Sequence, residues 1–287
     1  ESNFQGRYHA DKSYLRVITV QPTLSYRFND KLSVGFGPTF NHIEGELTSS
    51  VLNPTSLGSN DGKVKVKGDD TAVGFNLGVL YEFTPGTRAG LTYHSRVKYE
   101  LEGDTRVEAS PLAGIAGKYD ANLDLTTPES VDMSITHELN DAWTLYAGST
   151  WTRWSRFKEI RVENDSTTLP ANLSTIVEEQ NWHDTWAHAV GLSSKVSPQW
   201  TLRTGIAIDQ SPTNNVDRSP RVPSGDRTIF SVGAGWSPNP DMTIDVAYSY
   251  LQEESVDVNQ QSSTRGDYHA RYKNSAHGLG ASLSYRF

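Results

Sequence analysis

Hydrophobic and polar residues alternate along most of this chain, in short stretches separated by turn residues. In the first stretch the apolar face carries Ile18, Val20, Pro22, Leu24, Tyr26 and Phe28, and the residues between them are polar. A period of two is typical of a β-strand with one apolar and one polar face. The pattern recurs at 32–40, 73–83, 87–101, 131–139, 143–151, 186–192, 200–208, 230–236, 242–250 and 279–287. It therefore predicts about eleven strands and no helix of comparable strength.

The connections between these strands alternate in length. Turn residues such as Asn-Asp, Pro-Gly and Ser-Pro predict short turns at 29–31, 84–86, 140–142, 196–199 and 237–241. Longer polar loops are expected at 48–70, 103–128, 163–181, 211–226 and 253–272. A transmembrane barrel sorts its connections in this way, with short periplasmic turns and long external loops.

Aromatic residues cluster beside the predicted short turns, at Phe28, Phe83, Trp143, Trp200, Trp236 and Tyr285. Such rings favour the boundary between membrane and water, so they are interpreted as a periplasmic girdle. The alternative is a soluble β-sandwich with the same aromatics in its core, but the loops of a sandwich need not sort by length between its two ends.

The opposite strand faces are polar or small, as in Arg88, Thr92, His94, Arg96 and Lys98. Charged side chains are costly in lipid and tolerable in a lumen. We therefore expect an all-β fold, a transmembrane antiparallel up-and-down β-barrel with these faces inside. In the last strand Leu279, Ala281, Leu283, Tyr285 and Phe287 face lipid, and the C-terminus lies in the periplasm.

Composition narrows the class of protein further. No apolar run approaches the roughly 18 residues of a transmembrane helix. The chain has 287 residues, no Cys and a net charge of −8, so disulfides and thiol chemistry are excluded and nucleic acid is an improbable partner. We expect one domain over 1–287, with no metal or other cofactor. Because bacterial barrels have even strand numbers, we also expect N-terminal strands to be missing from this sequence.

Several stretches, in this order and spacing, resemble the FadL family of outer-membrane long-chain fatty-acid transporters, which also includes importers of aromatic hydrocarbons. They are Gly68 to Phe83 (GDDTAVGFNLGVLYEF), Leu91 to Val97 (LTYHSRV), Pro128-Glu129, Thr150 to Phe157 (TWTRWSRF), Arg203 to Pro212 (RTGIAIDQSP), and Arg221-Val222-Pro223 followed by Asp226-Arg227. The match extends over nearly the whole chain.

The resemblance implies a barrel of about fourteen strands plugged by an N-terminal hatch, of which this chain lacks the hatch and the first three strands. It also implies passive uptake of a hydrophobic molecule: capture by external loops, passage to an interior pocket and lateral release through the wall. The expected partners are the hydrophobic ligand (a fatty acid, hydrocarbon or detergent), membrane lipid, lipopolysaccharide and the barrel assembly machinery. The protein is expected to be a monomer.

In the family the capture groove is built from two long external loops, which correspond here to about 48–70 and 103–128. The candidate groove residues are Leu47, Val51, Leu52, Leu57, Leu112, Ile115, Leu123 and Leu125. A small satellite core that holds the loops together is an equally good interpretation, and a groove with a packed floor would satisfy both.

A carboxylate ligand would require a basic partner, for which bidentate arginine is well suited. The candidates near the lumen are Arg96, Lys98, Arg153, Arg156 and Arg203. Structural ion pairs are the more frequent use of such residues, so a neutral hydrocarbon ligand stays open. The Pro-rich run from Asp217 to Arg227 is interpreted as a loop braced by arginine and aspartate.

Two other functions are known for outer-membrane barrels. An outer-membrane lipase or protease would have Ser134, Thr136, His137 and His94 available, but strand parity places Ser134 and His137 on opposite faces. A general porin would have sixteen or more strands and an open lumen. We therefore expect a transporter without enzymatic activity.

Overall fold

Antiparallel strands dominate the computed structural model, which describes residues 4–51, 61–108, 114–262 and 265–287. Its helical turns are η1 (Gln5–Tyr8), η2 (Trp154–Arg156) and α1 (Ala171–Ser174). The strands are β1 (Lys12–Val20), β2 (Leu24–Arg27), β3 (Leu32–Val51), β4 (Gly62–Thr84), β5 (Thr87–His94), β6 (Val97–Glu108), β7 (Gly117–Thr127), β8 (Ser130–Glu138), β9 (Trp143–Thr152), β10 (Glu159–Asn164), β11 (Thr175–Glu179), β12 (Thr185–Lys195), β13 (Trp200–Asp209), β14 (Arg227–Asn239), β15 (Met242–Glu253), β16 (Val256–Gln260), β17 (Tyr268–Tyr272) and β18 (Ser275–Tyr285). No helix in the described ranges has the length and apolar character needed to cross a membrane.

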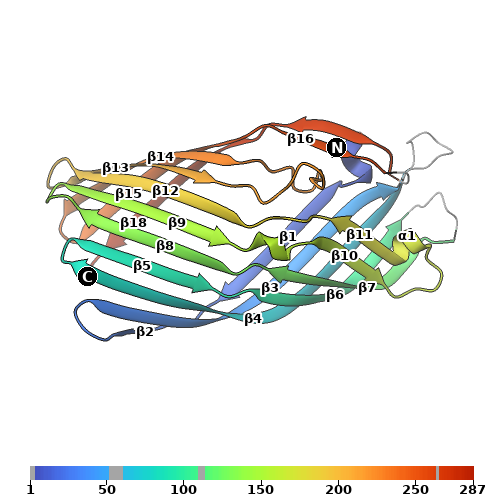
Figure 1. Cartoon of the computed structure of the whole chain (residues 1–287), viewed down its shortest axis with the longest axis horizontal. Helices are drawn as coiled ribbons and strands as arrows, with labels where there is room; N and C mark the ends of the chain where they lie inside the picture. Colours follow the sequence, from blue (N-terminus) through green and yellow to red (C-terminus); the bar gives the residue numbers. More distant parts are fainter. Residues whose placement is uncertain (1–3, 52–60, 109–113, 263–264) are drawn as a thin grey trace.

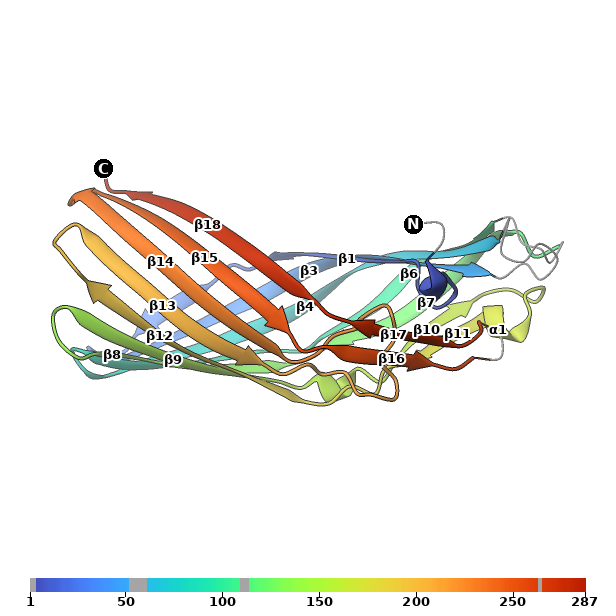
Figure 2. The same cartoon turned by 90° about the horizontal axis from the view of Figure 1, so that it is seen from above.

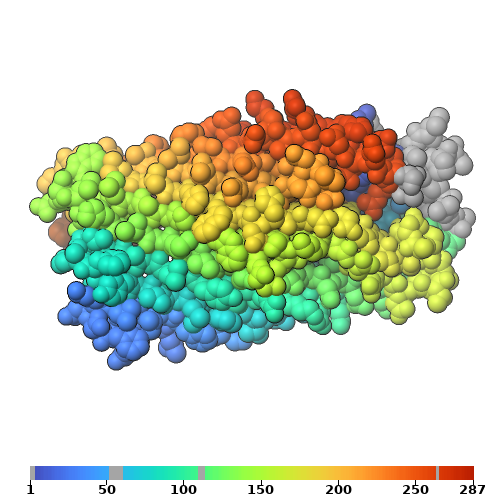
Figure 3. All heavy atoms as spheres, viewed as in Figure 1, coloured from blue at the N-terminus to red at the C-terminus, as the bar shows by residue number. Residues whose placement is uncertain are grey.

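One sheet of sixteen strands forms the wall. β1 and β2 both pair with β3, and the wall continues as β3-β4-β5-β8-β9-β12-β13-β14-β15-β18, each strand antiparallel to the next. Figure 3 shows the successive segments as bands that follow the sequence across the visible face. With β1 and β2 taken as one interrupted pass, the wall has the eleven passes that the alternation predicts.

Extra hairpins lengthen the wall at one end. The C-terminal part of β4 pairs with β5, whereas its N-terminal part, Lys63–Asp69, pairs with β6. β6 pairs in turn with β7, and β10 of the hairpin β10-β11 pairs with the other side of β7. The hairpin β16-β17 forms a separate two-stranded sheet. Figures 1 and 2 show these hairpins gathered at the end that carries the N-terminus, whereas the short turns and the C-terminus lie at the other end. The predicted sorting of connections is therefore confirmed.

The secondary structure predicted for two parts of this end is wrong. The regions 48–70 and 103–128 are largely strand rather than irregular loop, because β3 continues to Val51, β4 starts at Gly62, and β6 and β7 pair along their length. The predicted strand 87–101 is broken at Ser95–Arg96, where the chain passes from β5 to β6. At this break the Ser95 hydroxyl accepts a hydrogen bond from the Phe75 backbone N–H at 2.8 Å.

Side chains of turn residues fix the short connections. The amide oxygen of Asn29 accepts hydrogen bonds from the backbone N–H groups of Lys31 and Leu32, both at 2.9 Å. Asn140 does the same for Ala142 and Trp143 in the turn between β8 and β9. Such bonds stabilise the turn locally and so set the register of the strands on either side.

The apolar positions of the wall point away from the lumen. Val190, Ile206, Phe230 and Tyr250 lie opposite one another across β12, β13, β14 and β15. Large apolar side chains remain exposed on this face, for example 58% for Val190 and 50% for Phe230. The predicted girdle residues are also exposed, and the Trp200 and Trp236 rings stack at 6.1 Å between centroids. A surface this apolar is suited to lipid rather than to water.

The two edges of the sheet do not pair with each other within the described residues. β1 and β2 lie at one edge and β18 at the other, and all three strands are exposed along their length. The buried apolar cluster lies elsewhere, at the hairpin end, where Ile43, Val97, Tyr99 and Leu101 pack together inside the wall.

Because the apolar face points outward and the polar face inward, a charged substitution should destabilise the protein very differently at two neighbouring positions. A lysine at Ile206, on the outer face of β13, should destabilise the inserted protein by about 2–4 kcal/mol, because its charge enters the apolar layer. A lysine at Ala207, on the opposite face, should cost far less. The inserted fraction, measured from the mobility shift between unheated and heated samples on gels, checks this. Equal losses for the two variants would contradict the assignment of faces.

Candidate functional site

An apolar cavity of about 290 Å³ lies inside the hairpin end of the wall. Leu15 of β1, Leu47 of β3, Leu101 of β6 and two leucines of β7, Leu123 and Leu125, contribute to its lining. These side chains share a face because the register pairs Leu101 with Leu123, and Leu123 with Val162 of β10. Of the predicted groove residues, Leu47, Leu123 and Leu125 therefore converge on one cavity.

Three aromatic rings form another side of this cavity. Trp182 makes edge-to-face contacts with Trp154, at 4.9 Å between centroids, and with Phe157, at 4.7 Å. The turn η2 presents Trp154 and Phe157, and the Ser155 backbone N–H donates to the Asp184 carboxylate at 3.0 Å. These rings escaped the sequence analysis as site residues, although the aromatic run from Trp151 to Phe157 was a visible signal.

The carboxylate of Glu129 holds η2 in place. Arg156 donates to it from Nε at 2.5 Å and from Nη2 at 2.7 Å, and Arg153 donates from Nη1 at 3.1 Å. Chiefly because of the Arg156 hydrogen bonds, the pKa of the Glu129 carboxyl falls to about 2. Arg153 and Arg156 were both candidates for binding a ligand carboxylate, but each forms an ion pair with Glu129 instead.

A second, larger hollow of about 590 Å³ opens at the tip of the hairpins. Leu47 and Val51 of β3 line it, together with residues of β4, β10 and β11. Of the other predicted groove residues, Ile115 lines neither hollow. Leu52, Leu57 and Leu112 lie outside the described residues. Leu47, Val66, Ile160, Val162 and Arg221 line both the outer hollow and the inner cavity, so the two adjoin.

Arg221 lies at this junction and was not predicted as a site residue. Its side chain is 7% exposed and pairs with Glu178 of β11, Nε to Oε2 at 2.7 Å and Nη2 to Oε1 at 3.0 Å. Arg265 donates to the same carboxylate at 3.2 Å. The Asp217 to Arg227 loop is therefore braced, as predicted, but by a glutamate from another element. Nothing in the local sequence identifies Glu178 as that partner.

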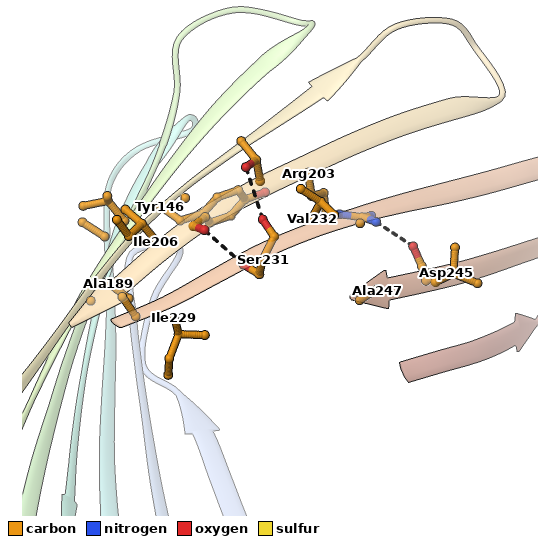
Figure 4. A pocket seen from close by; sticks show the side chains of 18 residues that line it. Tyr146, Ala189, Arg203, Ile206, Ile229, Ser231, Val232, Asp245 and Ala247 are labelled. Atoms are coloured by element: carbon orange, nitrogen blue, oxygen red, sulfur yellow. Dashed lines mark hydrogen bonds and ion pairs between the residues drawn. The ribbon is translucent and has the colours of Figure 1, made fainter. Parts of the chain in front are cut away.

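The remaining basic candidates lie away from the cavity. Arg203 pairs with Asp245 at 2.7 Å across β14, as the dashed line in Figure 4 marks. Both side chains line a hollow of about 600 Å³ over β9 and β12 to β15. A β-carbon on Gly235 would lie 2.6 Å from the Asp245 carboxylate and 3.0 Å from Arg203. A larger residue at this position would therefore push the two charged groups aside.

The prediction that Lys98 lines the lumen is wrong. After the break at Ser95–Arg96, the alternate residues Val97 and Tyr99 are buried inside the wall, so Lys98 lies on the outer face, where it pairs with Glu100 at 2.7 Å. Arg96 is exposed at the break, without a hydrogen bond or ion pair to any part of the chain that the structure describes. An irregular residue inverts all later faces of a strand.

The residues considered for hydrolase chemistry are separated. Ser134 lies opposite Gly90 and Gly148, whereas His137 lies on the other face and bonds to the Thr87 hydroxyl at 2.8 Å. His94 faces the lumen, bonded to Asp132 at 2.8 Å and to Asn76 at 2.9 Å. No grouping of three or more potential metal ligands occurs among the residues described.

The sequence matches the family described as "Outer membrane protein transport protein (OMPP1/FadL/TodX)" over residues 1–287. The chain belongs to this family. The resemblance to the FadL family drawn from the motifs is therefore confirmed, and with it the class of outer-membrane transport proteins in Gram-negative bacteria.

Individual relatives agree with this assignment. The long-chain fatty acid transport protein of Escherichia coli O6:H1 (strain CFT073) is 27% identical, over 99% of this chain and 70% of that protein. A solved Pseudomonas aeruginosa FadL homologue superimposes with a TM-score of 0.85 at 26% identity, covering 99% of this chain and 71% of that structure. Two further relatives are matched over only 53% and 54% of their length.

A more distant structure shares the fold. The Ralstonia pickettii toluene transporter TbuX aligns with a TM-score of 0.65 at 21% identity, over 95% of this chain and 68% of that structure. The all-β barrel class predicted from alternation is thus confirmed by FadL-family neighbours. The relatives are named as transporters, which points away from an enzyme.

The Glu129 cluster predicts a pH-dependent stability. Its folded-state pKa lies below the ordinary value of 4.5, so its contribution is complete above about pH 4.5 and is lost as the pH falls through about 2. Glu129→Gln should therefore lower the free energy of unfolding by about 2 kcal/mol at pH 7, where charged hydrogen bonds are broken. The difference from the unsubstituted protein should shrink towards pH 2.

Denaturant midpoints followed by tryptophan fluorescence at pH 7 and near pH 3 measure this difference. Glu159→Gln is the matched control, because the Glu159–Arg161 pair is more exposed and closes only within one strand. A pH-independent difference for Glu129→Gln would contradict the assigned role.

Proposed function

We propose that this chain takes part in passive uptake of hydrophobic molecules across the Gram-negative outer membrane, with long-chain fatty acids and hydrocarbons as the substrate class. The observation that carries the proposal is the adjoining pair of hollows at the hairpin end. The names of the relatives, a long-chain fatty acid transport protein and a toluene transporter, support the same substrate class.

In this proposal the outer hollow captures the ligand and the inner cavity binds it. The volume of the inner cavity, about 290 Å³, lies near the lower end of the roughly 300–1,000 Å³ typical of small-molecule sites. Transfer from water to such a lining stabilises a ligand by about 0.8 kcal/mol for each buried methylene. The energy gained on burial favours an alkyl or aryl ligand over a hydrated solute.

Lateral release through the wall completes the proposed route. Ser13, Tyr14 and Leu15 of β1 line the inner cavity. A ligand in the cavity therefore lies against a strand of the wall, which supports a sideways exit towards lipid. The proposal includes a periplasmic C-terminus, contact with lipid and lipopolysaccharide, insertion by the barrel assembly machinery and a monomeric state.

Filling the cavity should block uptake. Leu125→Trp adds a large ring to the cavity lining, whereas Asp124→Trp adds the same ring to the exposed outer face of β7. Cells that lack their own importer and express the full-length protein should grow on oleate or take up toluene. We expect Leu125→Trp to reduce the initial uptake rate at least tenfold and Asp124→Trp to reduce it less than twofold.

The amount of inserted protein is measured in parallel, so that a folding defect is recognised. Failure of the inserted, unsubstituted protein to take up any hydrophobic substrate would overturn the proposed function. Large, steady single-channel conductance would instead favour a general porin.

A further inference from the structure

A row of basic residues crosses the outer face of the wall at the hairpin end. Across β1, β3, β4, β6 and β7 the register places these residues at one level: Lys12, Thr48, Lys65, Arg106 and Lys118. Val64 and Val107, neighbours of the row in sequence, are buried inside the wall. Because side chains alternate between the two faces of a strand, the row points outward. Figure 2 shows β1, β3, β4 and β6 side by side at this end.

One carboxylate next to this row is shared by three lysines. The Glu46 carboxylate lies 3.1 Å from Nζ of Lys12, 3.2 Å from Nζ of Lys65 and 3.4 Å from Nζ of Lys67. Chiefly because of the hydrogen bond from Lys12, the pKa of the Glu46 carboxyl falls to about 2. The carboxylate is therefore charged at neutral pH, and it still leaves two of the three positive charges without a partner.

Arg106 adds another positive charge beside this cluster. It lies opposite Lys65, it is exposed, and it makes no hydrogen bond or ion pair within the part of the chain that the structure describes. Like charges directly opposite each other in a sheet are destabilising, so an anion between them would be favourable. We call Lys12, Lys65, Lys67, Arg106 and Glu46 the basic patch. Its four positive charges exceed its single negative charge by three, in a chain whose net charge is −8.

The border of the basic patch indicates the size of the anion that fits it. The charged side chains of this border are mostly acidic: Asp11, Lys63, Asp104, Glu108, Lys118 and Asp120. Both border lysines are already paired with aspartates, at 3.6 Å and 3.4 Å. A long polyanion such as a nucleic acid would meet these carboxylates, whereas a single phosphate group would contact the positive charges alone.

The height of the basic patch indicates what carries the phosphate. On the same face of β3, Phe36 and Phe40 are exposed as part of the apolar layer, and Glu46 lies six residues beyond Phe40. At about 3.3 Å per residue and a tilt of about 40°, the patch lies roughly 15 Å above that layer. A level between the two carries Arg16, Glu44, Asp69 and Glu102 and is therefore acidic.

This acidic level separates two kinds of lipid phosphate. The phosphate of a phospholipid lies at the edge of the apolar layer, where the carboxylates above it are unfavourable neighbours. A phosphate on the sugar core of a glycolipid lies further out, at the height of the basic patch.

We propose that the basic patch binds a phosphate group on the sugar core of an outer-leaflet glycolipid of the lipopolysaccharide class. Ammonium and guanidinium groups form short, charge-assisted hydrogen bonds to phosphate oxygens. The bound phosphate also compensates the positive charges that Glu46 leaves without a partner. This inference rests on the proposed placement of the hairpin end outside the membrane. It assigns a lipid site that is separate from the site of the transported ligand.

Binding of three probes to the full-length protein in non-ionic detergent tests the proposal. The probes are rough lipopolysaccharide with a phosphorylated core, the same material after removal of phosphate with hydrofluoric acid, and phosphatidylglycerol in mixed micelles. Affinities are measured by microscale thermophoresis at pH 7. We expect the phosphorylated glycolipid to bind at least tenfold more tightly than either other probe, and this advantage should shrink at high salt.

Substitutions then assign the preference to the basic patch. Lys65→Gln combined with Arg106→Gln should reduce the affinity for the phosphorylated glycolipid to that for the dephosphorylated form. Glu46→Gln removes the competing carboxylate and should strengthen phosphate binding about threefold, a gain that a folding defect cannot produce. Lys98→Gln is the matched control, because Lys98 lies on the same outer face and pairs with Glu100, and it should change affinity less than twofold.

The folded fraction of each variant is checked by the mobility shift between unheated and heated samples. Equal binding of the phosphorylated and dephosphorylated glycolipids, or a preference that survives the double substitution, would overturn the inference. Phosphatidylglycerol bound as tightly as the phosphorylated glycolipid, or weaker phosphate binding by Glu46→Gln, would overturn it as well. None of these results affects hydrophobic uptake, and a failure of uptake would leave the glycolipid site standing.

Discussion

The structure depends on the pairing of every wall strand with its neighbour in a register that keeps apolar positions on one face. In hydrocarbon there is no water to satisfy a backbone N–H or C=O group, so these groups must bond to the adjacent strand. The row Val190, Ile206, Phe230 and Tyr250 shows the result, since four strands contribute apolar side chains at one level. The polar and small residues between them are left to line the lumen.

At the hairpin end the strands also pair with their neighbours and keep apolar residues on one face, but that face lines a cavity. There the strands extend beyond the apolar layer, and their inner faces become apolar: Ile43, Leu101 and Leu123 point inward, while Lys98 and Glu100 point outward. The break at Ser95–Arg96 makes this exchange possible within one continuous segment. Ion pairs centred on Glu129 and Glu178 hold the helical turn and the loops against the cavity.

Much of this was available from sequence, because alternation and turn chemistry are local. The passes of the wall and the short turns with Asn29 and Asn140 follow from side-chain period and turn chemistry. The convergence of Leu47, Leu123 and Leu125 was expected from the resemblance to the FadL family, whose external loops form a groove. The inverted face of Lys98 did not follow, since a single irregular position changes parity without a distinctive residue type. The pairing of Glu178 with Arg221 joins positions 43 residues apart and leaves no periodic signal.

Gly235 illustrates how a small residue can leave room for an interaction between its neighbours. The ion pair between Arg203 and Asp245 passes over it and links two strands that are not adjacent. A slip of β14 by one position would bring Ala234 or Trp236 beneath the pair, and the two charged groups would have to move aside. The charged pair therefore fits best in the observed alignment of β13, β14 and β15. One glycine and two opposite charges thus add a preference for one strand alignment to that of the backbone hydrogen bonds.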